Sequence, residues 1–191
     1  MFASTTSAAL VGVDPVPVRV EAHVGGAREA FAIVGLPDTA VREARERVRS
    51  AIAASSFRLP SRRVTVNLAP ATLPKAGSAY DLSIALGVLA AAGLVPDRAC
   101  SVVALGELAL DGALRPARGT LAAAMVAVAR GLPCVVPAEA AAEAAAVPGA
   151  DVRPARTLVD AVSACLEPTG RVVSAPPPPP GPLHPDLADV R

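Results

Sequence analysis

The sequence has 191 residues, 52% of them hydrophobic, and its 18 basic and 17 acidic side chains leave a formal net charge of +1. A chain of this length can bury one sizeable core, which favours one domain with a tail over two full domains. The near-neutral charge excludes a whole-chain field that would attract nucleic acid or an anionic membrane.

Three cysteines, Cys100, Cys134 and Cys165, lie far apart and form no Cys-x-x-Cys pair. Their odd number, together with a start (MFASTTSAALVGV) that lacks the basic region of a secretory leader, predicts reduced thiols in the cytoplasm. No uncharged apolar run approaches the ~20 residues that a membrane helix needs. We therefore expect a cytoplasmic protein without membrane contact.

The first elements in chain order are predicted to be short strands. SAALVGV and VPVRVEAHV are separated by Asp14-Pro15, a turn signal, and apolar residues from 16 to 24 alternate with polar ones as in a half-buried strand. Gly25-Gly26 then turns the chain into FAIVGL, which predicts a β meander.

A helix follows, capped by Asp38 or Thr39, and its apolar stripe recurs at helical spacing from Val41 to Ile52. The later elements alternate between strands and helices. They are the strand RRVTVNL, a helix from about Tyr80 to Gly93, two strands around Asp111-Gly112, a helix over 120–130, the strand CVV, a helix over 138–146, the strand DVRPA, and a helix capped by Thr157. The order β-β-β-α-β-α-β-β-α-β-α-β-α predicts an α/β fold with a mixed sheet and helices mainly on one face.

The composition changes near the end of this pattern. SAPPPPPGPLHP cannot form a packed core, so we expect a domain over 1–167 and a proline-rich, extended linker over 168–185. The last residues, 186–191, read DLADVR. Because a linker joins two parts, the second part is expected to be missing.

Few residues suggest catalysis. The two histidines, His23 and His184, have no Cys, Asp or Glu at metal-ligand spacing, which argues against a zinc site and a Ser-His-Asp triad. Lys75 is the only lysine and is followed by Ala76, so the pattern GxxxxGK[ST] of a P-loop is absent. We expect no catalytic residue, cofactor or metal in this chain.

Ser78 and Lys75 are the exception to examine, because both lie on a loop that leads into an apolar helix. A desolvated, neutral Lys75 could act as the base that activates Ser78 in a Ser-Lys peptidase. In the simpler interpretation, which we adopt, Gly77 and Ser78 are turn residues and Lys75 is a solvated loop charge.

The densest charge lies between residues 42 and 63, where seven arginines accompany two glutamates. One of the seven is Arg47, and the remaining six are the candidate contact residues Arg42, Arg45, Arg49, Arg58, Arg62 and Arg63. An arginine surface can contact DNA phosphates, although no aromatic residues are placed to stack on bases. The alternatives are a contact with a neighbouring subunit and a solvated helix face with i,i+4 pairs.

The loop PKAGSA (74–79) resembles the PKDGPSAG-like loop of Lon-type proteases. This resemblance matches Ala79, not Ser78, with the nucleophile. In the segment that resembles the family's GGLKEK, it matches Leu121 with the lysine. The resemblance therefore implies a Lon-protease-like fold, including an unusual crossover, without either member of the catalytic dyad.

Three longer motifs are more specific: FAIVGLPDTAVREARERVRSAI, RVTVNLAPATLPKAGSAYDLSIALGVLAAAG and LGELALDGALRPARG. Over about residues 5–166 they resemble the N-terminal domain of the ComM/YifB family, magnesium-chelatase-like AAA+ ATPases associated with natural transformation. DLADVR resembles the start of that family's ATPase module. The resemblance implies a hexameric, ATP-driven DNA helicase or branch-migration factor, with ATP and Mg bound by the missing module. This chain is then a non-catalytic accessory domain that contacts its own ATPase module, neighbouring subunits or DNA.

Overall fold

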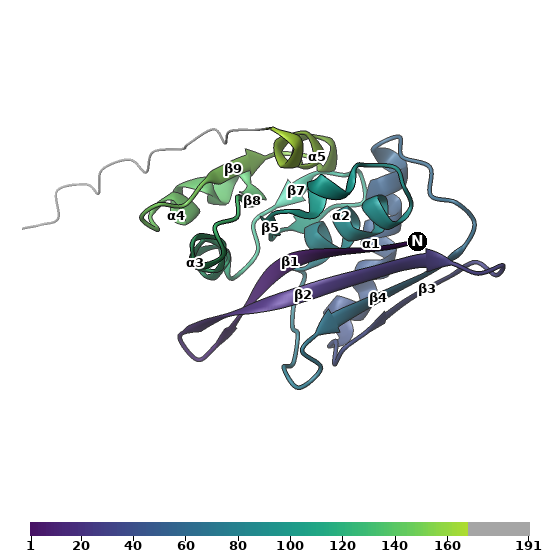
Figure 1. The fold of residues 1–191 in the computed structure, drawn as a ribbon, viewed down its shortest axis with the longest axis horizontal. Coiled ribbons are helices and arrows are strands. Elements are labelled where there is room, and N and C mark those ends of the chain that lie inside the picture. The colour runs from purple at the N-terminus through teal and green to yellow at the C-terminus, as the bar shows by residue number, and fades with distance from the viewer. Residues whose placement is uncertain (168–191) are drawn as a thin grey trace, which may run out of the picture.

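A seven-stranded mixed sheet organises the chain, with its strands in the order β3-β4-β2-β1-β5-β8-β9 (Figure 1). The computed structural model describes residues 1–167. The expected linker over 168–185 and the expected start of an ATPase module over 186–191 lie outside the described residues. The strands of the sheet are β1 (Phe2–Val11), β2 (Asp14–Gly25), β3 (Ala30–Val34), β4 (Arg63–Ala69), β5 (Val103–Ala104), β8 (Cys134–Pro137) and β9 (Val152–Ala155).

The first hairpin is long and its turn is tighter than expected. β1 and β2 pair antiparallel from Phe2↔His23 to Val11↔Asp14. The turn consists of residues 12 and 13, and Gly12 has φ +64°, which glycine adopts at little cost. The prediction that Asp14-Pro15 forms the turn is therefore wrong, because these residues begin β2.

The position of β3 corrects the expected meander. β3 does not pair with β2, which precedes it. It pairs parallel with β4, from Ala30↔Arg63 to Val34↔Asn67, and the helix α1 (Thr39–Ala54) connects the two strands. β4 in turn pairs antiparallel with β2. A period-2 pattern identifies a strand but does not specify its neighbour, so the order of strands could not be read from alternation.

The residues expected to form two strands around Asp111-Gly112 form three strands in the structure. The stretch around Asp111-Gly112 does form a hairpin, with β6 (Glu107–Leu108) pairing antiparallel with β7 (Leu114–Arg115) outside the main sheet. The residues just before it form the separate strand β5, which pairs parallel with β1 and β8.

Helix ends follow the local signals in the sequence. The carboxylate of Asp38 caps α1 by accepting a hydrogen bond from the Val41 N–H at 2.7 Å. Thr157 and Asp160 form a reciprocal capping box at the start of α5 (Leu158–Leu166). Gly131, with φ +61°, ends α3 (Thr120–Arg130). The other helices are α2 (Asp81–Ala91) and α4 (Ala141–Ala145), with short 3₁₀ turns η1 (Asp97–Cys100) and η2 (Ala138–Ala140).

Two hydrophobic clusters occupy the two faces of the sheet. The larger cluster takes residues from α1, α2 and α5, and the smaller takes residues from α3 and α4. Alternate residues of β8 divide between them, with Val135 in the larger cluster and Val136 in the smaller. Every residue of α2 is buried, which explains its apolar sequence. The predicted α/β fold with a mixed sheet is therefore confirmed, and three of the five α-helices within residues 1–167 share one face.

Candidate functional site

Lys75 is completely buried, so the prediction of a solvated loop charge is wrong. Its ammonium group donates hydrogen bonds to the backbone carbonyls of Gly35, at 2.9 Å, and of Pro70. Burial lowers the pKa of Lys75 from its ordinary value. The lysine thus joins two loops, one before α1 and one after β4, that are far apart in the sequence.

Backbone and side-chain bonds reinforce the same connection. The Lys75 N–H donates to the Leu36 carbonyl at 3.3 Å, and the Asp38 N–H donates to the Lys75 carbonyl at 3.0 Å. The second carboxylate oxygen of Asp38 accepts from the Gly77 N–H at 3.1 Å. We call the segments 35–38, 70–81 and 106–108, which these and the following contacts connect, the loop junction.

Gly35 makes the close approach of these loops sterically feasible. It has φ +101°, and a Cβ atom at this position would lie 2.1 Å from the Leu68 carbonyl oxygen. Real Cβ atoms do not come this close to backbone, so only glycine fits here without a shift of β4. The glycine in the sequence VGLPD therefore has a structural reason, the close approach of this loop to β4.

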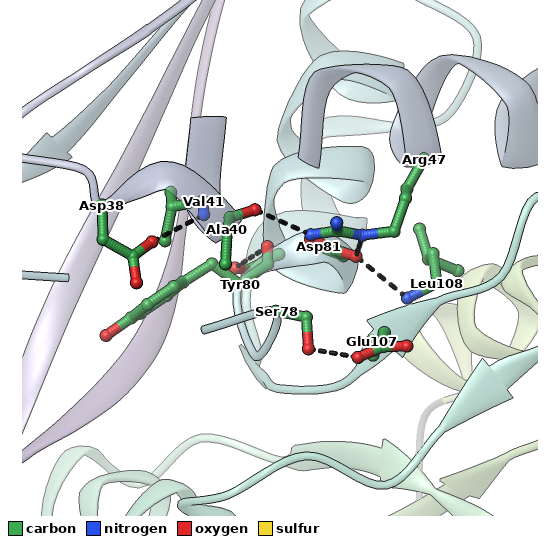
Figure 2. A network of polar contacts seen from close by, with 10 residues as sticks. Asp38, Ala40, Val41, Arg47, Ser78, Tyr80, Asp81, Glu107 and Leu108 are labelled. Carbon is green, nitrogen blue, oxygen red and sulfur yellow. Dashed lines mark hydrogen bonds and ion pairs between the residues drawn. The ribbon is translucent and has the colours of Figure 1, made fainter. Parts of the chain in front are cut away.

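Ser78 and Lys75 do not form a dyad in this structure, because each side chain is bonded to other groups. The Ser78 hydroxyl donates to the carboxylate of Glu107 in β6 (Figure 2). Ala79, which the resemblance matches with the nucleophile, is buried in the smaller cluster beside residues of α3. Leu121, which it matches with the lysine, has a 44% exposed side chain at the start of α3. None of these contacts places a serine in hydrogen-bond reach of a lysine, which a Ser-Lys dyad requires.

Arg47 and Asp81 form a bidentate ion pair that joins α1 to the start of α2 (Figure 2). The Arg47 guanidinium reaches the two carboxylate oxygens at 2.6 and 3.1 Å and also donates to the Ala40 carbonyl at 3.0 Å. Asp81 additionally accepts from the Leu108 N–H at 3.2 Å, which attaches the β6–β7 hairpin. Only 1% of the Asp81 side chain is exposed, so this carboxylate depends on these partners.

The junction shifts the protonation of its own groups. Burial raises the pKa of Asp81 to about 6, although Arg47 opposes this shift. Burial, together with the charge of Asp38, raises the pKa of Tyr80 to about 12. The carboxylate of Asp81 is held by Arg47 and by the Leu108 N–H, so its shifted pKa indicates a structural network rather than a group aimed at open space.

The six arginine candidates divide into two groups. Arg47, the seventh arginine of the segment, was not among them, and its guanidinium is committed to Asp81. Arg42, Arg45 and Arg49 recur at helical spacing along the exposed side of α1. The others, Arg58, Arg62 and Arg63, are exposed on and after the loop that connects α1 to β4.

The structure brings three of the six candidates together around two adjoining hollows. An open hollow of about 640 Å³ is lined by Arg49, Ile52, Ala53, Ser56, Phe57, Arg58 and Leu59. A smaller one, of about 70 Å³, is lined by Glu29, Ala30, Phe31, Arg49, Leu59, Pro60, Ser61, Arg62 and Val64. Arg49 and Leu59 belong to both. We call this pair of depressions the arginine hollow; Arg42, Arg45 and Arg63 do not line it.

Sequence reasoning did not identify the apolar floor of the arginine hollow, although a signal was available. Phe57 and Leu59 alternate with Arg58 in the stretch FRLP, and both pack against the larger cluster while remaining partly exposed. The pairing of Arg47 with Asp81 had no comparable local signal, because the partners are 34 residues apart.

Over residues 1–167 no cluster of three or more His, Cys, Asp or Glu side chains is placed to hold a metal ion. Cys100, Cys134 and Cys165 are free thiols, and burial raises the pKa of each. Within the same residues no helix combines the length and apolar character needed to cross a bilayer.

Comparison with known proteins gives a consistent family. The model of a family described as subunit ChlI of Mg-chelatase matches residues 20–140. An uncharacterized protein of Mycobacterium tuberculosis (strain H37Rv) is 45% identical over 154 residues, which is 80% of this chain and 31% of that protein. YifB of Escherichia coli K12, an uncharacterized protein, is 44% identical over 129 residues, 67% of this chain and 26% of that protein.

Competence protein ComM of Haemophilus influenzae is 40% identical over 157 residues, 82% of this chain and 31% of that protein. The chain thus spans about a third or less of the length of these relatives. The region matched by the family model contains α1, α2, the whole loop junction and the whole arginine hollow. The chain belongs to the ComM/YifB family of Mg-chelatase-like proteins.

Proposed function

We propose that this chain is a non-catalytic accessory domain of a ComM-like AAA+ ATPase, and that it serves ring assembly or contact with DNA or a partner. The parent activity that we propose is ATP-driven DNA helicase or branch migration during natural transformation. The name of the Haemophilus influenzae relative, competence protein ComM, supports this context. ATP and Mg would be bound elsewhere in the parent protein, because this chain carries no P-loop pattern.

One observation carries the proposal: the only lysine of the chain, the residue that a Ser-Lys peptidase would need as its base, is used to hold two loops together. Its ammonium group donates to the Gly35 and Pro70 carbonyls. A general base must reach the proton that it removes, and Ser78 instead donates to Glu107. The exposed arginines remain as the residues available for contact.

A serine-reactive fluorophosphonate probe tests the non-catalytic part of the proposal. We expect the purified chain to show no labelling of Ser78, no cleavage of casein and no hydrolysis of ATP. Ser78→Ala serves as the control for background labelling. Labelling of Ser78 that disappears in Lys75→Ala would contradict the proposal and establish the alternative, a Lon-type Ser-Lys peptidase.

The accessory part is tested in a full-length family member that carries this domain. Removal of the domain should leave basal ATP hydrolysis in place and impair ring assembly, DNA binding or partner binding. If all of these persist unchanged without the domain, the accessory role is wrong even when the chain is catalytically inert.

A further inference from the structure

We propose that the arginine hollow is a docking site for an acidic segment of a partner protein that also carries apolar side chains. This inference rests on the proposed function, since it assigns the contact of the accessory domain to one surface and one chemistry. Its distinguishing feature is the combination of arginines at the rim with an apolar floor, beside a helix and a sheet edge that are both exposed.

The floor of the hollow is made by apolar groups that the core leaves partly uncovered. Phe57 and Leu59 pack on the larger cluster from the loop after α1 and stay partly exposed. On the helix side Ala53 is exposed, whereas Ile52 lines the hollow from within the core. A hollow of about 640 Å³ is large enough to take one or two apolar side chains of a peptide. Burying such side chains supplies binding energy that an electrostatic contact alone would lack.

One arginine at the rim of the hollow already binds a carboxylate, which shows how the site would hold an acidic partner. The Arg49 guanidinium, which borders both hollows, pairs with the carboxylate of Glu29 at 2.5 Å. Arg58 and Arg62, on either side of Arg49 in the lining, make no salt bridge within the described residues. The Arg49–Glu29 pair therefore shows the geometry that acidic side chains of a partner would repeat at Arg58 and Arg62.

The apolar floor favours a protein partner over nucleic acid. Exposed cations are sufficient to bind a phosphate backbone, which makes no contact that an apolar floor would strengthen. Recognition of bases requires stacking surfaces. Phe57 and Phe31 line the hollows beside the arginines, which corrects the expectation that no aromatic residue is placed there, but both are partly covered by the larger cluster. Charge complementarity with an apolar anchor is instead the pattern of peptide recognition in a groove.

The edge strand β3 lies beside the site. Among residues 1–167, β3 has a strand partner only on its β4 side, and its first residues, Ala30 and Phe31, line the smaller hollow. An extended peptide that placed its apolar side chains on the floor could therefore continue along this edge and pair with its free backbone groups.

Binding is measured on the whole 191-residue chain by fluorescence anisotropy with three labelled probes. The first is a short peptide in which glutamates alternate with leucines, and the second has serine in place of every leucine. The third is a short DNA duplex. We expect the glutamate–leucine peptide to bind more tightly than the glutamate–serine peptide, because only the first fills the apolar floor.

Matched variants locate the site. Arg58→Gln with Arg62→Gln should weaken binding of the glutamate–leucine peptide about fivefold or more, since two charge contacts are lost. Arg42→Gln with Arg63→Gln removes the same charge from arginines outside the hollow and should change binding less than about twofold. Ala53→Glu, which places a carboxylate in the larger hollow, should abolish binding, whereas Ala54→Glu on the next, non-lining residue should not.

Each other outcome overturns the inference. Equal weakening by both arginine pairs, with DNA bound more tightly than either peptide, identifies a diffuse nucleic-acid surface. Association of the chain with itself that Ala53→Glu abolishes identifies a second copy as the occupant. Absence of binding by all probes shows that the hollow is not a docking site. None of these results would restore a catalytic Ser78, so failure here is distinct from failure of the proposed function.

Discussion

The loop junction and the arginine hollow lie at different ends of the same helix, and they use the same residue types in opposite ways. At the junction, Arg47 is mostly covered and saturates a carboxylate, and Lys75 has no exposed surface at all. At the hollow, Arg58 and Arg62 are exposed above partly covered apolar side chains. The polar groups of the junction connect its loops, whereas Arg58 and Arg62 of the hollow form no salt bridge within residues 1–167.

This difference reverses the order in which the sequence alone would rank these residues as functional candidates. A serine and a lysine before a helix resemble chemistry, yet each is occupied by a structural contact. A run of arginines resembles an ordinary solvated face, yet three of them converge on one depression. Because exposed arginines contribute little to stability, replacing them should weaken binding and leave the free energy of unfolding nearly unchanged. Variants of the junction should show the opposite behaviour.

The largest effect is expected from breaking the buried ion pair. Arg47→Ala leaves the Asp81 carboxylate, 1% exposed, without its cation, and should lower the free energy of unfolding by about 3–5 kcal/mol. Urea unfolding measures the change, and Arg45→Ala, on the exposed side of the same helix, should cost less than about 1 kcal/mol. Arg47→Met combined with Asp81→Leu should recover part of the loss. Similar costs for Arg47→Ala and Arg45→Ala would remove the distinction between the two regions.

The second-largest loss of stability is expected from Gly35→Ala. The new Cβ would meet the Leu68 carbonyl oxygen at 2.1 Å in a backbone with φ +101°, so we expect a loss of about 2–4 kcal/mol in thermal or urea unfolding. Gly77→Ala is the matched control in the same junction. Its φ is +82°, but nothing lies within 4 Å of the added Cβ, so it should show only the backbone cost of about 1–2 kcal/mol. Equal losses would mean that the close approach is not tight.

A pH dependence should come from Asp81. Burial raises its pKa from 3.8 to about 6, so the folded state holds the proton more tightly than the unfolded state. The resulting stabilisation is fully present below the unfolded pKa and is lost as the pH rises through the folded pKa. Between about pH 4 and about pH 7 the free energy of unfolding of the wild type should fall by about 2–3 kcal/mol relative to Asp81→Asn. Exposed Asp97→Asn is the control. A constant difference across this range would show that Arg47 keeps the carboxylate at its ordinary pKa.

The smallest of these effects is expected at Lys75. Lys75→Met keeps an unbranched buried stem but removes the hydrogen bonds to the Gly35 and Pro70 carbonyls, and should cost about 1–2 kcal/mol. Arg62→Met removes a cation from the exposed rim of the hollow and should stay within about 0.5 kcal/mol. Differential scanning calorimetry of the two variants compares the regions directly. A Lys75→Met variant as stable as wild type would leave the lysine without a structural role.

Local features of the fold could be predicted from the sequence because their causes are local. Asp38 and Thr157 cap helices through residues three positions away, and Gly131 ends a helix by its own backbone conformation. The partner of β3 could not be predicted, since the choice between β2 and β4 depends on a crossover through α1. The division of the later hairpin region into β5 and β6 likewise depends on pairing with distant strands.

The site was predictable only in part for the same reason. The arginine-rich segment was visible as composition, and its exposed members are where helical spacing places them. Whether an arginine on α1 faces Asp81 or solvent depends on where α2 begins in space, and Arg47 and Arg49 differ in just this respect. The burial of Lys75 was unpredictable because carbonyls of two distant segments create its environment.

Native-state hydrogen exchange tests the contrast between the two regions most directly. The amides of Asp38, Lys75 and Gly77 all donate within the loop junction, whereas those of Arg58, Leu59 and Ser61 donate no backbone hydrogen bond among residues 1–167. If the loop junction opens only when the whole domain unfolds, its amides should exchange with free energies close to that of global unfolding. The amides of the loop that lines the hollow should exchange almost freely. Exchange at Lys75 and Gly77 as fast as at Arg58 would show a mobile loop instead, and would contradict the assignment of Lys75 and Ser78 to structure rather than chemistry.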